Sequence, residues 1–143
     1  MPDPEVDARH IMNALAHGLT GHRERIPAEL APVLDQGPGG MYAALSSLAE
    51  VAVSDQKPKR GQFLGIQVER AGVPASAADA PPAVRFAMQF MAAQANGDLD
   101  MTHSLFKAML VKTPLDLADA LGIVFDAAVV TVRAQAARAE DGE

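Results

Sequence analysis

Proline, glycine and asparagine divide the second half of the chain into segments with the starts and ends of helices. Pro81-Pro82 supplies the fixed φ that suits a first helical turn, and Asn96-Gly97 supplies a typical stop. Asp98 or Asp100 then caps the next segment. These boundaries predict two successive helices, the first ending at Asn96-Gly97.

The last segment has the clearest predicted start. Thr113 is expected to cap it, with Pro114 at the first helical position and Asp116 as the acid of a capping box. The helix should run to about Ala137, roughly 35 Å at 1.5 Å per residue. Residues 140–143 are acidic and are expected to fray.

The first half begins with another marked helix start. Asp3 can cap, Pro4 fits the first position, and Glu5 and Asp7 favour the positive end of the helix dipole. Apolar residues at helical spacing then share one face: Ala8, Ile11, Met12, Leu15 and Leu19. This helix should stop near Gly18 or Gly21.

Prolines interrupt the next stretch. Pro27 and Pro32 predict one or two short helical turns ending at Gly37, because a proline inside a helix removes a hydrogen bond. The sequence Gly37-Pro38-Gly39-Gly40 is interpreted as a break. A helix is then expected from about Met41 to Ser54.

Residues 55–82 form the least regular part of the sequence. The segment Phe63–Val68 could be a short strand or a loop. No second strand is evident to pair with it, and a lone strand is not stable. We therefore expect a long ordered loop here, which in a compact domain is functional or flexible.

Length and composition agree with a helical domain. A chain of 143 residues suits one domain with one core, and 49% apolar residues are enough to fill it. Alanine, the best helix former, is the commonest residue. The sequence predicts an all-α, single-domain bundle of five or six helices, with a long C-terminal helix and an irregular central loop.

Charge and residue usage narrow the partners and the location. The net charge is −6 and the few basic residues are scattered, so no nucleic-acid partner is expected. The lack of cysteine excludes disulfides and thiolate metal sites. Residues 1–7 lack the apolar segment of a secretory signal, and the longest apolar run, Ala127–Val132, is too short to span a membrane. A cytoplasmic location is expected, and the alanine-rich, lysine-poor usage hints at a bacterial source.

Two histidines of the first helix are candidates for chemistry. His10 and His17 lie on one line, away from the face of Ile11 and Leu15, and are expected to point to solvent or to a partner. Asp7, His10 and His17, completed by His103, are the residues of a possible metal site. Ligands on one helix usually lie three or four residues apart, a spacing that His10 and His17 do not meet. An exposed polar face is therefore preferred, and no metal or cofactor is expected.

The last helix carries the predicted interface. Asp119, Asp126 and Arg133 recur every seven residues, and beside them lies a second apolar strip of Ile123, Val130, Ala134 and Ala137. A helix with apolar residues on two sides is usually covered on both. We expect a homodimer in which Asp119 of one chain approaches Arg133 of the other. The alternative is that the loop of residues 55–82 covers the strip within one chain.

Methionine and phenylalanine gather on the two helices after Pro82. Such residues can line an adaptable apolar pocket. The candidate pocket residues are Phe86, Phe90, Met91, Phe106 and Met109. At helical spacing these residues more often belong to the core, so the pocket is the second interpretation.

Catalytic patterns are weak. Ser104 adjoins His103, but neighbours on a helix point about 100° apart and cannot act as nucleophile and base. The glycines at 37–40 lack the lysine of a phosphate-binding loop. The leading hypothesis is a non-enzymatic interaction or regulatory module that self-associates and binds a protein partner. The alternatives are a small apolar ligand-binding protein and a metal-dependent helical enzyme.

Overall fold

The computed structural model describes residues 3–54, 68–70, 73–75 and 80–141. Within these residues the chain forms six α-helices and one short 3-10 helix, η1 (Arg23–Arg25). The helices are α1 (Pro4–Leu19), α2 (Ile26–Leu34), α3 (Pro38–Ala52), α4 (Pro82–Ala95), α5 (Leu99–Lys112) and α6 (Asp116–Glu140). The prediction of an all-α bundle with a long C-terminal helix is confirmed.

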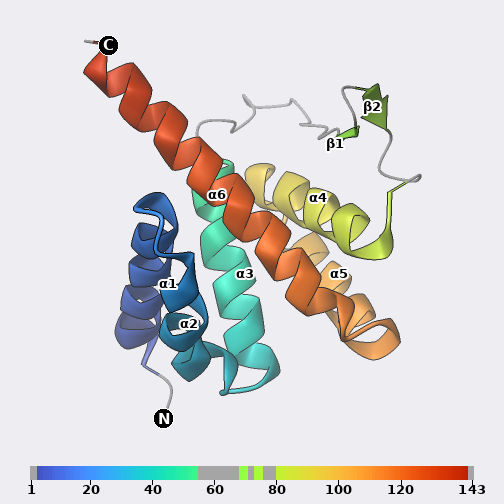
Figure 1. Ribbon diagram of the computed structural model, residues 1–143. Helices are drawn as coiled ribbons and strands as arrows, with labels where there is room; N and C mark the ends of the chain where they lie inside the picture. The colour runs from blue at the N-terminus through green and yellow to red at the C-terminus, as the bar shows by residue number, and fades with distance from the viewer. Residues whose placement is uncertain (1–2, 55–67, 71–72, 76–79, 142–143) are drawn as a thin grey trace.

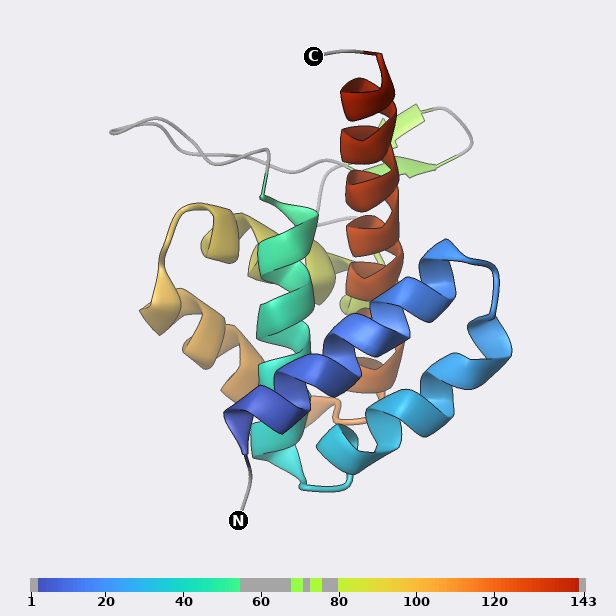
Figure 2. The same ribbon diagram turned by 90° about the vertical axis from the view of Figure 1, so that its left-hand side faces the viewer.

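The long helix α6 organises the arrangement. It lies across α3, with α1 and α2 on one side and α4 and α5 on the other (Figures 1 and 2). No helix among the described residues has the length and hydropathy needed to cross a membrane.

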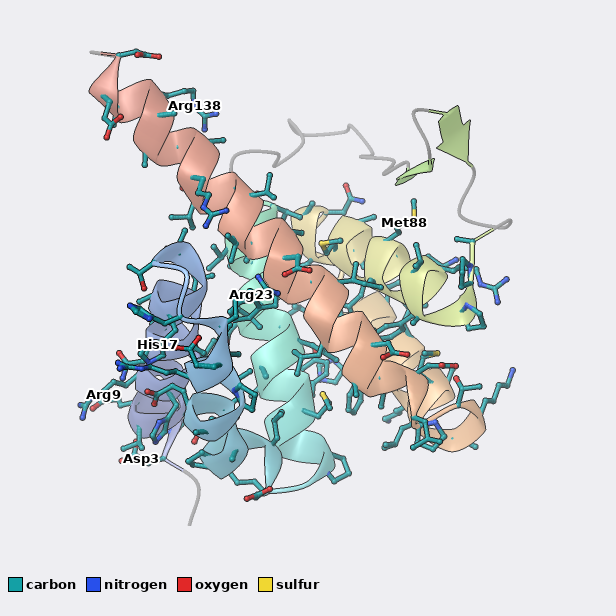
Figure 3. The ribbon with its side chains drawn as sticks, in the orientation of Figure 1. Asp3, Arg9, His17, Arg23, Met88 and Arg138 are labelled. Carbon is teal, nitrogen blue, oxygen red and sulfur yellow. The ribbon has the colours of Figure 1, made fainter. Side chains whose placement is uncertain are left out.

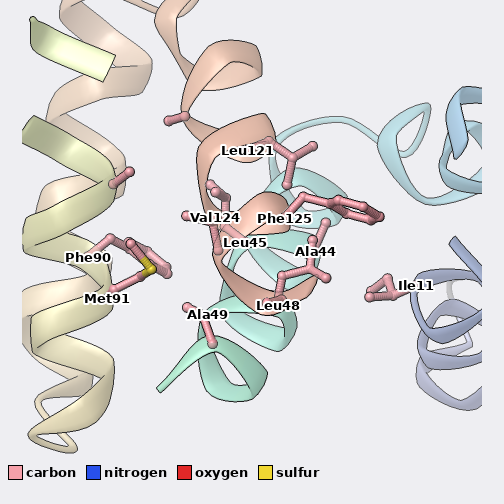
Figure 4. Packing of buried hydrophobic residues seen from close by; sticks show 14 of the residues in the cluster. Ile11, Ala44, Leu45, Leu48, Ala49, Phe90, Met91, Leu121, Val124 and Phe125 are labelled. Atoms are coloured by element: carbon pink, nitrogen blue, oxygen red, sulfur yellow. The ribbon is translucent and has the colours of Figure 1, made fainter. Parts of the chain in front are cut away.

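Small side chains let α3, α4 and α6 approach closely. Ala44, Ala49, Ala87, Ala120 and Ala128 are fully buried. Figure 4 shows the larger core side chains around these crossings, among them Leu45, Leu48, Phe90, Val124 and Phe125. Fitting leucine and phenylalanine between alanine-lined backbones gives the close packing that protein interiors require.

Several helix ends form as the sequence predicts. The Asp3 carboxylate accepts hydrogen bonds from the backbone N–H groups of Glu5 and Val6, at 3.0 and 3.5 Å. Asp98 caps α5 by accepting from the N–H of Met101 at 3.1 Å. Gly97, with φ +71°, takes the left-handed conformation that ends α4.

The predicted cap of the last helix is wrong. Thr113 ends α5, and its hydroxyl donates to Met109 Sδ at 3.2 Å instead of accepting from α6. A turn through Pro114 follows, closed by the hydrogen bond from Asp116 N–H to the Thr113 carbonyl at 3.0 Å. Helix α6 therefore begins at Asp116, without a side-chain cap.

Two boundaries around the glycine-rich break also differ from the prediction. Helix α2 continues through Pro32 as one element. Gly37, with φ +97°, makes the turn alone, so that Pro38 already opens α3. A Cβ atom on Gly40 would lie 1.9 Å from the Val33 carbonyl oxygen, so the break serves to bring α2 and α3 together.

The irregular region contains a small hairpin that the sequence did not predict. Strand β1 (Val68–Arg70) pairs antiparallel with β2 (Val73–Ala75), with Val68 opposite Ala75. The expectation that no second strand is present to pair is therefore wrong. Strand β2 was not predicted because it contains Pro74, and proline within a strand is confined to edge positions. Residues 55–67, 71–72 and 76–79 of the expected loop lie outside the described residues.

Candidate functional site

The outer face of α6, defined here as Asp119, Ile123, Asp126, Val130 and Arg133, is the candidate interface. All five residues share one face of α6, because they follow one another at intervals of three or four residues. Ile123 is half-buried and the other four side chains are exposed. Val130 is 65% exposed, an unusual amount for a β-branched apolar residue in the middle of a long helix.

Two charged groups of this face are held by the end of α1 and by the segment that follows it. Arg23 Nη2 lies 2.8 Å from Asp126 Oδ1, and Figure 3 shows Arg23 reaching over α6. Arg133 Nη2 donates to the carbonyl oxygens of Gly18 and Leu19, each at 3.4 Å. A cation is favourable there because the last carbonyls of α1 carry the negative end of its dipole. Asp119 contacts no basic side chain among the described residues.

An apolar groove runs beside this face. It has a volume of about 330 Å³ and lies where α6 meets the end of α3 and α4. Ala52, Val53, Met91 and Ala127 line it, and Val130 is on its rim. The Thr131 hydroxyl closes one end by donating to the Ala52 carbonyl at 2.8 Å. The apolar surface around Val130 therefore continues from α6 onto the end of α3 and onto α4.

The methionine and phenylalanine residues of the candidate pocket separate into two groups. Phe86, Phe90, Met91 and Phe106 are buried in the core (Figure 4 shows Phe90 and Met91). Met109 is half-buried on the surface of α5. The structure therefore does not gather all five around one open cavity, although Phe86 and Met109 line a second groove together.

This second groove lies between the start of α4 and the second half of α5. It has a volume of about 330 Å³, and Phe86, Leu105, Ala108 and Met109 form its apolar lining. The remaining lining residues are polar or lie at helix ends: Pro82, Arg85, Gln89, Lys112 and Thr113. The lining contains two cations and no acidic side chain.

Tyr42 of α3 contacts aromatic side chains of both α4 and α5. Its ring meets Phe90 and Phe106 edge-on, at centroid distances of 6.0 and 5.3 Å, and stacks on His103 at 4.6 Å. The Tyr42 hydroxyl hydrogen-bonds Thr102 Oγ1 at 2.8 Å. Sequence reasoning missed this residue because its partners come from α4 and α5, far along the chain.

The histidines of α1 lie outside the core, but each is only partly exposed because it contacts Glu29 of α2. His10 Nδ1 lies 2.6 Å from one Glu29 oxygen, and His17 Nε2 lies 3.6 Å from the other. The hydrogen bond from His10 holds the pKa of the Glu29 carboxyl below its usual 4.5, with smaller contributions from Asn13 and His17. The side chains of His10 and His17 are thus partly covered by Glu29 of α2. The sequence alone did not indicate this role of Glu29.

The possible metal ligands are not brought together. His103 stacks on Tyr42, and Asp7 accepts a hydrogen bond from Gln36 Nε2 at 2.8 Å. Across the ranges that the structure describes, no group of three or more histidine, aspartate or glutamate side chains is arranged to hold a metal ion.

Comparison with known proteins returns no match. No family model, no curated protein and no solved structure is similar to the chain at a significant level.

Proposed function

We propose that this chain is a non-enzymatic helical interaction module that forms a homodimer through the outer face of α6 and, once paired, binds a protein partner. The observation that carries the proposal is the exposed Val130, placed among charges that match when the face meets a second copy of itself.

The charges repeat symmetrically about Asp126. Asp119 precedes it by seven residues and Arg133 follows it by seven. If two α6 helices cross antiparallel at Asp126, each Asp119 therefore lies opposite the partner's Arg133. At 1.5 Å per residue the same arrangement brings Val130 level with Ile123 of the other chain, to within about one residue. A two-fold axis makes each of these contacts twice.

The pairing places two Asp126 side chains near the axis, where like charges would repel. Each Asp126 already has Arg23 of its own chain at 2.8 Å, which offsets its charge. The connection between α1 and α2 lies beside α6, to its right in Figure 2. The second helix is therefore expected on the opposite side, over Ile123, Val130 and the adjoining groove.

Apolar residues away from this face support contact with another protein. Val111 and Leu115, near the turn between α5 and α6, are 83% and 87% exposed. We expect these two side chains to contribute to the contact with the protein partner.

Charge reversal tests the dimer. Asp119→Arg alone, or Arg133→Asp alone, places like charges opposite each other, and each should weaken dimerisation at least about tenfold, or about 1.4 kcal/mol. An equimolar mixture of the two variants restores opposite charges at both contacts, and we expect it to dimerise like the wild type in sedimentation velocity.

Two controls accompany this experiment. Asp100→Arg, on exposed α5, should leave dimerisation unchanged, and thermal unfolding should show that Arg133→Asp remains folded despite losing its contacts with α1. A wild-type chain that stays monomeric at millimolar concentration contradicts the proposal. So does a mixture that dimerises no better than either variant alone.

A further inference from the structure

The groove between α4 and α5, described above, combines apolar side chains with two cations and takes no part in the proposed dimer contact. We infer that this groove binds a small amphiphilic anion, a carboxylate with an apolar tail. The inference does not depend on dimerisation.

The groove joins an apolar floor to two cations. Phe86, Leu105 and Met109 form the floor, and Arg85 and Lys112 approach from the two facing helices. Neither cation makes a hydrogen bond or an ion pair with the described residues. In a chain of net charge −6, two neighbouring cations without acidic partners mark a local preference for a negative ligand.

Helix stability explains one of these cations but not the other. Lys112 lies in the last turn of α5, where a positive charge is favourable. Arg85 lies at the start of α4, near the positive end of the helix dipole, where a positive charge is unfavourable. No side chain caps that end of α4. An anion would offset the unfavourable charge of Arg85.

The apolar part of the groove fits a tail. Leu105 and Ala108 belong to a row on α5 that continues to Met101, which is 47% exposed. The row from Lys112 to Met101 is about 16 Å long at 1.5 Å per residue. The Thr113 hydroxyl fixes the Met109 thioether at 3.2 Å, so the floor is preformed. The volume of about 330 Å³ lies within the range of small-molecule sites.

Three other grooves among the described residues lack this combination. The groove between α1 and α3 includes Asp7, and the groove beside α6 includes Asp126. In the groove between α2 and α6, the cation Arg23 is already paired with Asp126. A carboxylate ligand is therefore expected between α4 and α5 rather than at these places.

Titration with decanoate below its micelle concentration tests the inference. We expect saturable binding with one site per chain in calorimetry. In a spectrum of the chain labelled with carbon-13 at its methionine methyl groups, Met101 and Met109 should shift, while Met12 and Met41, on other helices, should not. The double substitution Arg85→Gln with Lys112→Gln should lower the affinity at least tenfold.

Lys107→Gln is the matched control, because Lys107 is an exposed lysine of α5 outside the groove lining. It should bind decanoate as the wild type does. Octyl glucoside, which has an apolar tail and no charge, should bind at least tenfold more weakly. Absence of saturable binding, shifts at Met12 or Met41 instead of Met109, or an affinity that the double substitution leaves unchanged would each overturn the inference.

Discussion

Gly40 and Gly39 stand side by side in the first turn of α3, but their surroundings differ. The hydrogen atoms of Gly40 face the last turn of α2, where a Cβ atom would lie 1.9 Å from the Val33 carbonyl oxygen. Gly39 faces open space, with nothing within 4 Å of the position of its Cβ. One glycine is required by packing and its neighbour is not.

Alanine at these two positions should therefore act in opposite directions. Gly40→Ala forces α2 and α3 apart and should lower the free energy of unfolding by about 1–3 kcal/mol, the usual range for overpacking. Gly39→Ala should raise it by up to about 1 kcal/mol, because alanine loses less backbone entropy in a helix. Urea unfolding of both variants measures the difference, and equal effects would show that the approach of α2 to α3 is not tight.

At the scale of elements, α1 and α2 are joined by an acid and two imidazoles. Glu29 of α2 lies against His10 and His17 of α1, and His10 is the closer at 2.6 Å. The polar faces of these helices contact each other, while Ile11 and Leu30 enter the core. The pair is therefore sensitive to the charge on one carboxylate.

The pKa of Glu29 gives this contact a pH dependence. Because hydrogen bonding lowers its pKa in the folded chain, Glu29 stabilises the fold above its unfolded pKa of about 4.5. That contribution disappears as the pH falls through the lowered pKa. Glu29→Gln should be less stable than the wild type at pH 7, and the difference should shrink toward pH 3.

Urea unfolding at several pH values between 3 and 7 measures this difference. Glu140→Gln, at the exposed end of α6, is the control and should show little change across the range. A difference between Glu29→Gln and the wild type that stays constant from pH 7 to pH 3 would argue against the ionised contact.

At the scale of the whole molecule, α6 and α3 together link the pair α1 and α2 to the pair α4 and α5. Phe125 of α6 packs where α1 has Gly18, whose Cβ would lie 2.8 Å from the ring. Tyr42, the chain's single tyrosine, lies on the other side among α3, α4 and α5. Because α6 packs on both groups, we expect the helices to unfold together.

Tyr42 fluorescence and far-ultraviolet circular dichroism should therefore give the same urea midpoint. Phe125→Ala should lower the free energy of unfolding by about 3–5 kcal/mol and shift both midpoints equally, although the ring contacts of Tyr42 are with Phe90, His103 and Phe106. Leu115→Ala, at an exposed position, should change it by less than about 0.5 kcal/mol. Separate midpoints for the two probes would mean that the halves unfold independently.

Local chemistry explains which predictions from the sequence hold. Asp3 caps α1 and Asn96-Gly97 ends α4, because a cap needs only the backbone of its own turn. Thr113 fails as a cap although its local pattern is good. Its hydroxyl donates a hydrogen bond to the sulfur of Met109 instead. Because a tight turn follows Thr113, α6 begins only at Asp116.

The same distinction holds for the candidate sites. Helical periodicity was sufficient to place Asp119, Asp126 and Val130 on one face of α6, since positions on a helix follow from spacing alone. It could not show that Arg23 forms an ion pair with Asp126 or that Glu29 contacts His10. Nor could it show that Phe90 is buried, or that Met109 lines a groove with Arg85. Those outcomes depend on which helices pack side by side, and such contacts join residues far apart in the chain. The sequence by itself therefore determined the helices and their faces, and the tertiary structure alone decided what each face meets.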